Sequence, residues 1–187
     1  FDVRNYVDVS MRNPRSLDST DFNWYDAGTK QGFIHDNQLS VSGASDKFNY
    51  LISGAYTNQA GYIINDLFKR ITLRVNLESQ TTDWLKLGVQ SFGSFVNADG
   101  AEPDLGALFQ MSPLQTPYKA DDSYNPFPFN SVDPNPFLTY DISDRERHNY
   151  LFANVFGEVN IPFVKGLTYR VNFGNNYRTD QRFYASK

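Results

Sequence analysis

The most regular part of the sequence is an alternation of apolar and polar residues between positions 68 and 89. Every second residue from Ile71 to Leu77 is apolar, and the residues between them, such as Arg70 and Arg74, are polar. A short polar segment follows, and the alternation resumes at Leu85. Because successive side chains of a β-strand point to opposite faces, the pattern predicts two strands joined by a turn, with one apolar and one polar face.

The same alternation recurs on both sides of this pair of strands. It is most regular between Leu167 and Phe173, where apolar residues alternate with Thr168, Arg170 and Asn172. We therefore expect an all-β domain over residues 34–180, made of antiparallel up-and-down strands. The six expected strands cover about residues 34–44, 48–57, 68–78, 84–96, 146–160 and 167–179.

The connections between these strands differ in length at the two ends of the sheet. Three are short, at residues 45–47, 79–83 and 161–166, and in a meander all three fall at one end. The longer connections, 58–67 and 97–145, fall at the other end. Outer-membrane β-barrels have short periplasmic turns and long extracellular loops, so the asymmetry favours a barrel whose apolar face contacts lipid. A soluble β-sandwich remains the alternative, since single alternating strands are also typical of that fold.

Two segments lack the alternation. We interpret residues 1–33 as a loop region that leads into the barrel on the extracellular side. Residues 97–145 form the long loop, where repeated prolines prevent regular strands. Within it, Pro103–Met111 (PDLGALFQM) is compatible with a short helix. Aromatic side chains in this loop favour ordered contacts over disorder.

The aromatic residues near strand ends are candidates for the two interfacial girdles of a barrel. At the short-turn end they are Phe48, Trp84 and Tyr169, and at the long-loop end they are Tyr56, Phe68, Phe95 and Tyr150.

Two sets of side chains are candidate functional residues. The first set consists of cations on the polar parity, which would face the lumen or the plug that fills it: Arg70, Arg74, Lys86, Arg170 and Arg178. The second set consists of loop aromatics suited to stacking on a sugar ring or packing against a partner protein: Trp24, Tyr25, Tyr118, Tyr124 and Tyr140. Packing of the loops against themselves is the alternative for each aromatic residue.

Composition and motifs exclude several function classes. A net charge of −4 and a pI near 5.1 leave no basic footprint for nucleic acid. The chain has no cysteine, and His35 and His148 show no metal-ligand spacing, so we expect no metal site and no cofactor. No catalytic motif is recognisable, and we expect that the protein is not an enzyme.

Particular segments, in order, resemble SusC/RagA-type TonB-dependent transporters. The matching segments are LSVSGASDK (39–47), NY (49–50), SGAYTNQAG (53–61), FKR (68–70), LRVNL (73–77), DWLKLG (83–88), MSPL (111–114), NP (135–136), KGLTYR (165–170) and NFG (172–174). Each motif alone is weakly specific, but together they span most of residues 21–178.

The resemblance implies a barrel of 22 strands filled by an N-terminal plug. It implies import of oligosaccharides or peptides through the outer membrane of a Bacteroidetes-type bacterium, with a SusD-like lipoprotein as lid and TonB as the energy source. The plug, the TonB-contact segment and most strands of the family are absent from this chain. We therefore expect it to be a fragment of the barrel. The alternative function is that of a soluble β-sandwich that binds carbohydrate.

Overall fold

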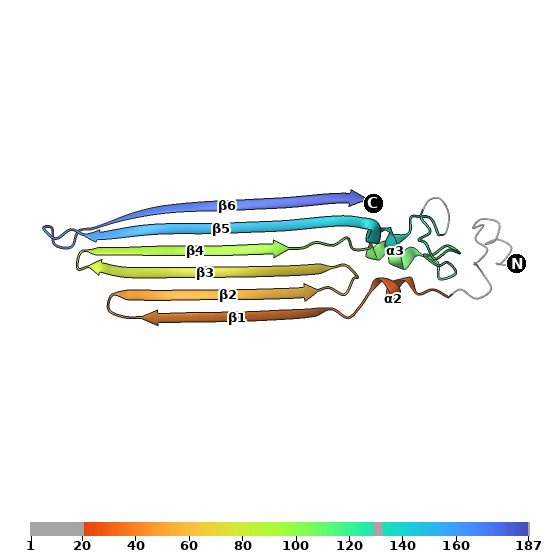
Figure 1. The fold of residues 1–187 in the computed structure, drawn as a ribbon, viewed down its shortest axis with the longest axis horizontal. Helices are drawn as coiled ribbons and strands as arrows, with labels where there is room; N and C mark the ends of the chain where they lie inside the picture. The colour runs from red at the N-terminus through yellow and green to blue at the C-terminus, as the bar shows by residue number, and fades with distance from the viewer. Residues whose placement is uncertain (1–20, 129–132, 187) are drawn as a thin grey trace.

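The computed structural model describes residues 21–128 and 133–186. All six of its strands form one antiparallel sheet with the order β1-β2-β3-β4-β5-β6 (Figure 1). The strands are β1 (Phe33–Ala44), β2 (Phe48–Ala60), β3 (Leu67–Thr82), β4 (Leu85–Asn97), β5 (Ile142–Asn160) and β6 (Thr168–Ser186). The expected class of all-β, up-and-down antiparallel strands is confirmed.

The strands extend further at the long-loop end than the alternation indicates. β5 begins at Ile142 instead of near residue 146, and β6 continues to Ser186 instead of ending near residue 179. The two strands stay in register to the pair Ile142–Ser186. The alternation at the start of β5 is one of charges of opposite sign, from Asp144 to His148, so apolar periodicity does not mark it as a strand.

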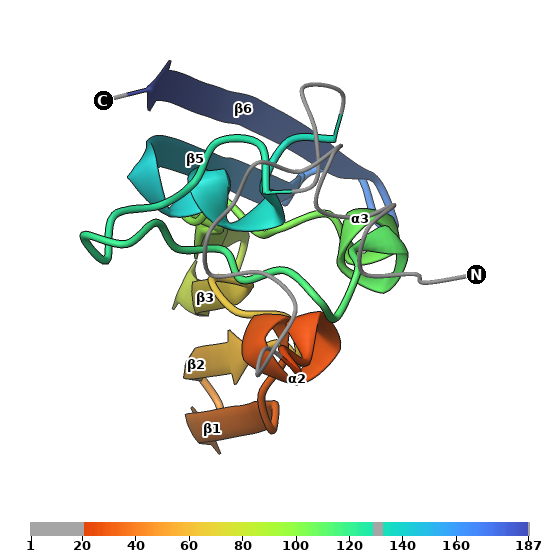
Figure 2. The ribbon, with the colours of Figure 1, turned by 90° about the vertical axis from the view of Figure 1, so that its right-hand side faces the viewer.

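A β-sandwich needs a second sheet packed on the apolar face. In the part of the chain that the structure describes, no second sheet covers that face. Leu39 and Phe173 are 75% and 73% exposed there. The two views of the ribbon show a single twisted layer (Figures 1 and 2). The sandwich alternative is therefore wrong for the described residues.

The short helices gather beyond the long-loop end of the sheet (Figure 1). They are α2 (Trp24–Gly28), α3 (Leu105–Gln110) and the 3-10 helix η1 (Pro136–Asp141). α3 lies inside the segment expected to be helical, whereas α2 corrects the expectation of a plain loop before residue 33; residues 1–20 of that loop lie outside the described part. Asn23 caps α2, since its side chain accepts a hydrogen bond from the Asp26 amide at 3.1 Å. Among the described residues, no helix is long and apolar enough to cross a membrane.

A small apolar core holds these helices together. Trp24 of α2, Leu108 of α3, Met111 and Phe137 of η1 are all buried in it. It joins segments that are more than 100 residues apart in the sequence. This loop core fixes the position of the long loop relative to the end of the sheet.

Candidate functional site

The register of the sheet sorts the side chains of all six strands onto two faces. Residues that lie opposite each other in neighbouring strands point to the same side. One row across the sheet is Leu39, Gly54, Leu73, Gly93, Leu151 and Tyr177, and an adjacent row on the other side is Gln38, Ala55, Thr72, Ser94, Tyr150 and Arg178. We name the side with Leu73 the apolar face and the side with Thr72 the polar face.

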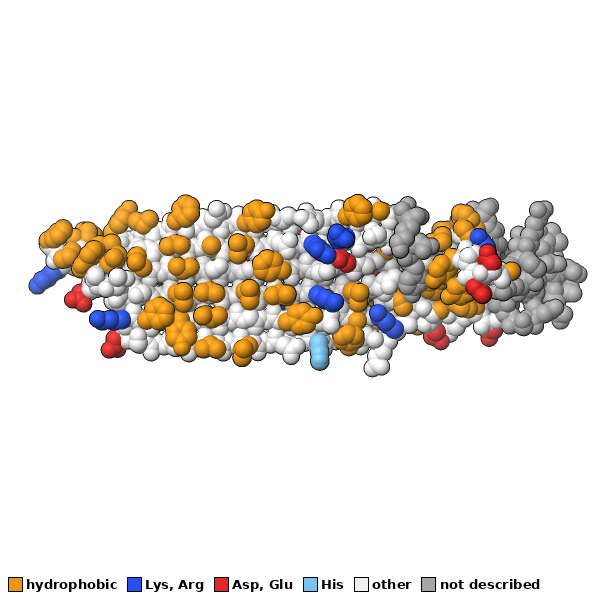
Figure 3. All heavy atoms as spheres, in the orientation of Figure 1, with side chains coloured by type: hydrophobic (Ala, Val, Ile, Leu, Met, Phe, Trp, Pro, Cys, Tyr) orange, Lys and Arg blue, Asp and Glu red, His pale blue; other side chains and the backbone are white. Residues whose placement is uncertain are grey.

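The apolar face carries a continuous band of exposed hydrophobic side chains (Figure 3). The band runs from the row of Leu85 to the row of Phe95. That distance is about 33 Å along the strand. At the tilt of about 40° that barrel strands adopt, it corresponds to a height of about 25 Å, the thickness of the apolar band of an outer-membrane barrel.

The polar face carries every acidic residue of the six strands. They are Asp36, Glu78, Asp144, Glu146, Glu158 and Asp180. All five cations predicted to share one face lie there too. Lys86 pairs with Glu78 at 3.6 Å and Arg170 with Glu158 at 3.6 Å. Arg178 donates to Asp180 at 2.8 Å, Arg70 donates to Thr57 at 3.5 Å, and Arg74 lies 5.7 Å from the centre of the Phe92 ring.

His148 is the centre of a polar cluster that its sequence context does not indicate. Its Nδ1 lies 2.7 Å from an oxygen of Asp180, and its Nε2 lies 3.0 Å from Glu146. Arg182 lies 4.0 Å from the other Glu146 oxygen. The partners come from β5 and β6, and only the register of these two strands brings them together.

Aromatic side chains also occur on the polar face. Two of them were predicted to belong to the girdle at the long-loop end, and that prediction is wrong for both. Tyr56 and Phe95 lie on the apolar face, in one row, as a girdle requires. Phe68 and Tyr150 lie on the polar face, because their parity within the strand places them opposite Gln59 and Ser94.

Gly88 lies beneath a closely packed aromatic ring on the polar face. Phe156, which is 2% exposed, lies over this glycine, and the Arg170 guanidinium lies 4.1 Å from the centre of the Phe156 ring. A Cβ added to Gly88 would lie 2.2 Å from two atoms of the ring. We expect Gly88→Ala to destabilise the sheet by about 1–3 kcal/mol through overpacking.

The matched control for Gly88→Ala is Gly157→Ala on the apolar face. Its new Cβ would lie 3.5 Å from Leu87, an ordinary contact. This variant should be neutral or more stable by up to about 1 kcal/mol, because alanine restricts the unfolded chain. Urea unfolding of protein reconstituted in vesicles measures both. Equal losses for the two variants would contradict the assigned packing.

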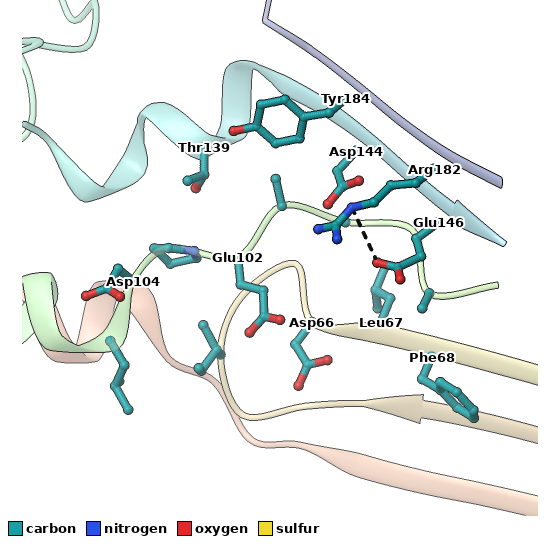
Figure 4. A pocket seen from close by; sticks show the side chains of 16 residues that line it. Asp66, Leu67, Phe68, Glu102, Asp104, Thr139, Asp144, Glu146, Arg182 and Tyr184 are labelled. Atoms are coloured by element: carbon teal, nitrogen blue, oxygen red, sulfur yellow. Dashed lines mark ion pairs between the residues drawn. The ribbon is translucent and has the colours of Figure 1, made fainter. Parts of the chain in front are cut away.

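A cavity of about 620 Å³ opens between the loops and the ends of β3, β5 and β6 (Figure 4). Its lining is rich in carboxylates: Asp66, Glu102, Asp104, Asp144 and Glu146. Asp66 and Glu102 point toward each other in the close-up view, and Arg182 and Tyr184 line the opposite side (Figure 4). Burial, and then the charge of Asp66, raises the pKa of Glu102 above that of an ordinary glutamate.

This cavity can supply hydrogen-bond acceptors, one cation and one phenol to a polar ligand. Within residues 21–128 and 133–186, no group of three or more His, Asp or Glu side chains is arranged to hold a metal ion. The carboxylate-rich lining suits a polar or cationic organic group.

The predicted loop aromatics have different environments. Tyr25 is 37% exposed and stacks on Phe109 with centroids 4.9 Å apart. Tyr118 is 39% exposed and stacks on Tyr124 at 5.4 Å. The side chain of Tyr140 lies outside the described part of the structure.

The prediction that Trp24 contacts a substrate or partner is wrong for this structure. Its ring is only 2% exposed, and Nε1 donates to the Ser112 carbonyl at 2.9 Å. A buried ring cannot stack on a ligand, so Trp24 is a loop-core residue in this structure. Its flanking sequence is as polar as that of an exposed aromatic, which is why the sequence did not show this burial.

Comparison with known proteins gives several sequence relatives, although no protein-family model matches the chain. TonB-dependent receptor P3 of Formosa agariphila is 28% identical over an alignment of 182 residues that covers 90% of this chain and 17% of that protein. TonB-dependent receptor SusC of Bacteroides thetaiotaomicron is 24% identical over 191 residues, with 88% and 19% covered. The chain thus spans less than a fifth of the length of these relatives.

Solved structures share the fold. The RagAB peptide importer in its closed-closed state superposes with a TM-score of 0.66 at 20% identity, over 93% of this chain and 22% of that one. A RagAB peptide transporter structure gives 0.65 at 20% identity, over 91% and 21%. The resemblance to SusC/RagA-type TonB-dependent transporters is thereby confirmed: in sequence and in fold, the chain is similar to a six-stranded segment of the barrel of such a transporter.

Proposed function

We propose that this chain forms part of the wall of an outer-membrane nutrient importer of the TonB-dependent type. The observation that carries the proposal is the sorting of side chains onto the two faces of the sheet. One face carries an apolar band of membrane thickness, and the other holds every carboxylate of the six strands. In this arrangement the apolar face contacts lipid, and the polar face lines the lumen and contacts the plug. The short turns are periplasmic, and the loop core is extracellular.

We propose that the cargo is an oligosaccharide or a peptide. We also propose that a SusD-like lipoprotein is the partner protein. Both proposals are supported by the names of the relatives, a SusC receptor and a RagAB peptide importer. Coupling to TonB would run through a plug domain. The relatives are named as receptors and transporters, which agrees with a protein that has no catalytic role.

The loop end is where we place contact with cargo or partner. Tyr25 and Tyr118 expose aromatic faces that neighbouring rings already hold in place. The carboxylate-lined cavity lies at the same end of the sheet. Preorganised aromatic faces beside hydrogen-bonding groups suit the recognition of sugars and of peptide side chains.

Site-directed labelling tests which face contacts lipid. The chain contains no cysteine, so single cysteines at Leu73 and Thr72 give two adjacent positions on opposite faces. A spin label at Leu73→Cys should be accessible to oxygen and protected from a water-soluble nickel chelate in vesicles. The label at Thr72→Cys should show the opposite preference. Equal accessibility to the chelate at both positions would overturn the proposal.

A further inference from the structure

Toward the loops, a row that is entirely polar interrupts the apolar face, and Phe33, Leu67 and Phe183 follow on its far side. This row lies directly beyond the row of Tyr56, Ile71 and Phe95, where the hydrophobic band stops. Its members are His35, Asn58, Lys69, Asn97, Arg147 and Gln181. If the band spans the hydrocarbon layer, as proposed above, this row stands at the level of the lipid headgroups.

The charges near this row are unbalanced toward positive. Lys69, Arg145 and Arg147 point to the apolar face, whereas all strand carboxylates point to the polar face. Arg147 lies 3.4 Å from Asp99, a loop residue, which neutralises part of its charge. Lys69 and Arg145 form no ion pair with any residue that the structure describes.

A depression of about 340 Å³ lies between the two nearer cations. Lys69 and Arg147 border it on one side, and Tyr56, Ile71 and Phe95 on the other. Lys69 and Arg147 are both register partners of Asn97, so their backbones lie about 10 Å apart, two strand spacings. Two long, flexible cations at that separation can both reach one anionic group placed between them.

We propose that this depression binds the phosphate of an anionic lipid headgroup in the leaflet on the loop side, with Lys69 and Arg147 contacting the phosphate and Tyr56 and Phe95 contacting the first carbons of the acyl chains. A lipid is the occupant that fits both halves of the site, because the cations lie directly above hydrophobic side chains at a membrane boundary. Free phosphate would use only the cations. The proposal rests on the lipid-facing orientation of the apolar face.

The test is a titration followed by native mass spectrometry of the protein in neutral detergent. The ligands are a lipid A that carries its phosphates, the same lipid A after dephosphorylation, and inorganic phosphate. We expect lipid A to bind at least about tenfold more tightly than its dephosphorylated form, since each basic side chain near an anionic lipid contributes about fivefold. Inorganic phosphate at millimolar concentration should not displace it.

The decisive variant is K69Q/R147Q, and R70Q/R178Q is its matched control. The control removes the same charge at a similar height on the polar face. The preference for phosphorylated lipid A should be lost in K69Q/R147Q and retained in R70Q/R178Q, with both variants keeping the circular dichroism of the parent. Retention of the preference in K69Q/R147Q, its equal loss in both variants, or displacement by inorganic phosphate would each overturn the proposal. If the label at Leu73 is protected from the chelate while the lipid preference is absent, this inference alone has failed.

Discussion

Replacing Val75 with arginine is expected to destabilise the protein in a bilayer by about 2 to 4 kcal/mol, the cost of an arginine on the lipid face of a barrel at the membrane midplane. Val75 occupies the row of Val41, Ile52 and Ala153, near the middle of the apolar band. There the guanidinium is far from both headgroup layers, and the neighbouring rows offer no carboxylate. The sheet must either leave the charge in hydrocarbon or distort so that the charge reaches water.

The depth dependence of this effect separates lipid burial from general disruption of the strand. Phe95→Arg lies at the edge of the band, where the same charge reaches the headgroups and the direct lipid cost falls to about 0–1 kcal/mol. Asn76→Arg adds a charge to the polar face, one residue from Val75, and should be nearly neutral. Reversible urea unfolding in phospholipid vesicles compares the three variants. A loss for N76R equal to that for V75R would show that the added charge disrupts the strand on either face, and would contradict the lipid-facing assignment of the apolar face alone.

The faces of the sheet were predictable from the sequence because one physical rule governs every strand. Residues such as Leu73 and Val171 contact an apolar medium, and residues such as Arg74 and Arg170 contact a polar one. Apolar and polar residues therefore alternate along each strand with a period of two. The five polar-face cations could therefore be grouped together without coordinates. The lengths of the turns then fixed the order of the strands.

Features that depend on the pairing of distant strands could not be predicted in this way. The cluster of His148, Glu146 and Asp180 requires the exact alignment of β5 with β6, and a slip of one residue would move every side chain of one strand to the other face. The predicted girdle included Phe68 and Tyr150 because both are aromatic residues near strand ends. Their polar-face position follows from strand parity instead.

The loop core was also beyond the sequence pattern, because its segments have no common period. Phe22, Trp24, Leu108 and Phe137 come from loops rich in proline and polar residues. In the sequence, Trp24 is therefore indistinguishable from the exposed tyrosines. Burial in such a loop is decided by tertiary packing, which no local window of the sequence records.

Replacing Trp24 with alanine should detach the loops without unfolding the sheet. The ring is stacked on Phe137 with centroids 5.7 Å apart, meets Phe22 edge-on at 5.1 Å, and donates to Ser112. Loss of a fully buried aromatic side chain costs about 3–5 kcal/mol when the site cannot collapse. That exceeds what the short helices α2 and α3 can recover from their caps, each worth about 1 kcal/mol.

Hydrogen exchange resolves this loss by region. Amides of α3 and η1 should exchange about two to three orders of magnitude faster in Trp24→Ala, because local opening free energy sets their protection, while amides in the middle of β3 and β4 should keep their rates. Tyr25→Ala is the control. Tyr25 is the next residue, is partly exposed, and among the described residues stacks on Phe109 alone, so its removal should change α3 exchange by less than about tenfold. Unchanged exchange in Trp24→Ala would show that the loops hold their positions through backbone contacts alone. A faster exchange that also reached the centre of β3 would show that the loop core and the sheet unfold as one unit. In that case the loops could not rearrange around cargo while the barrel wall stays intact.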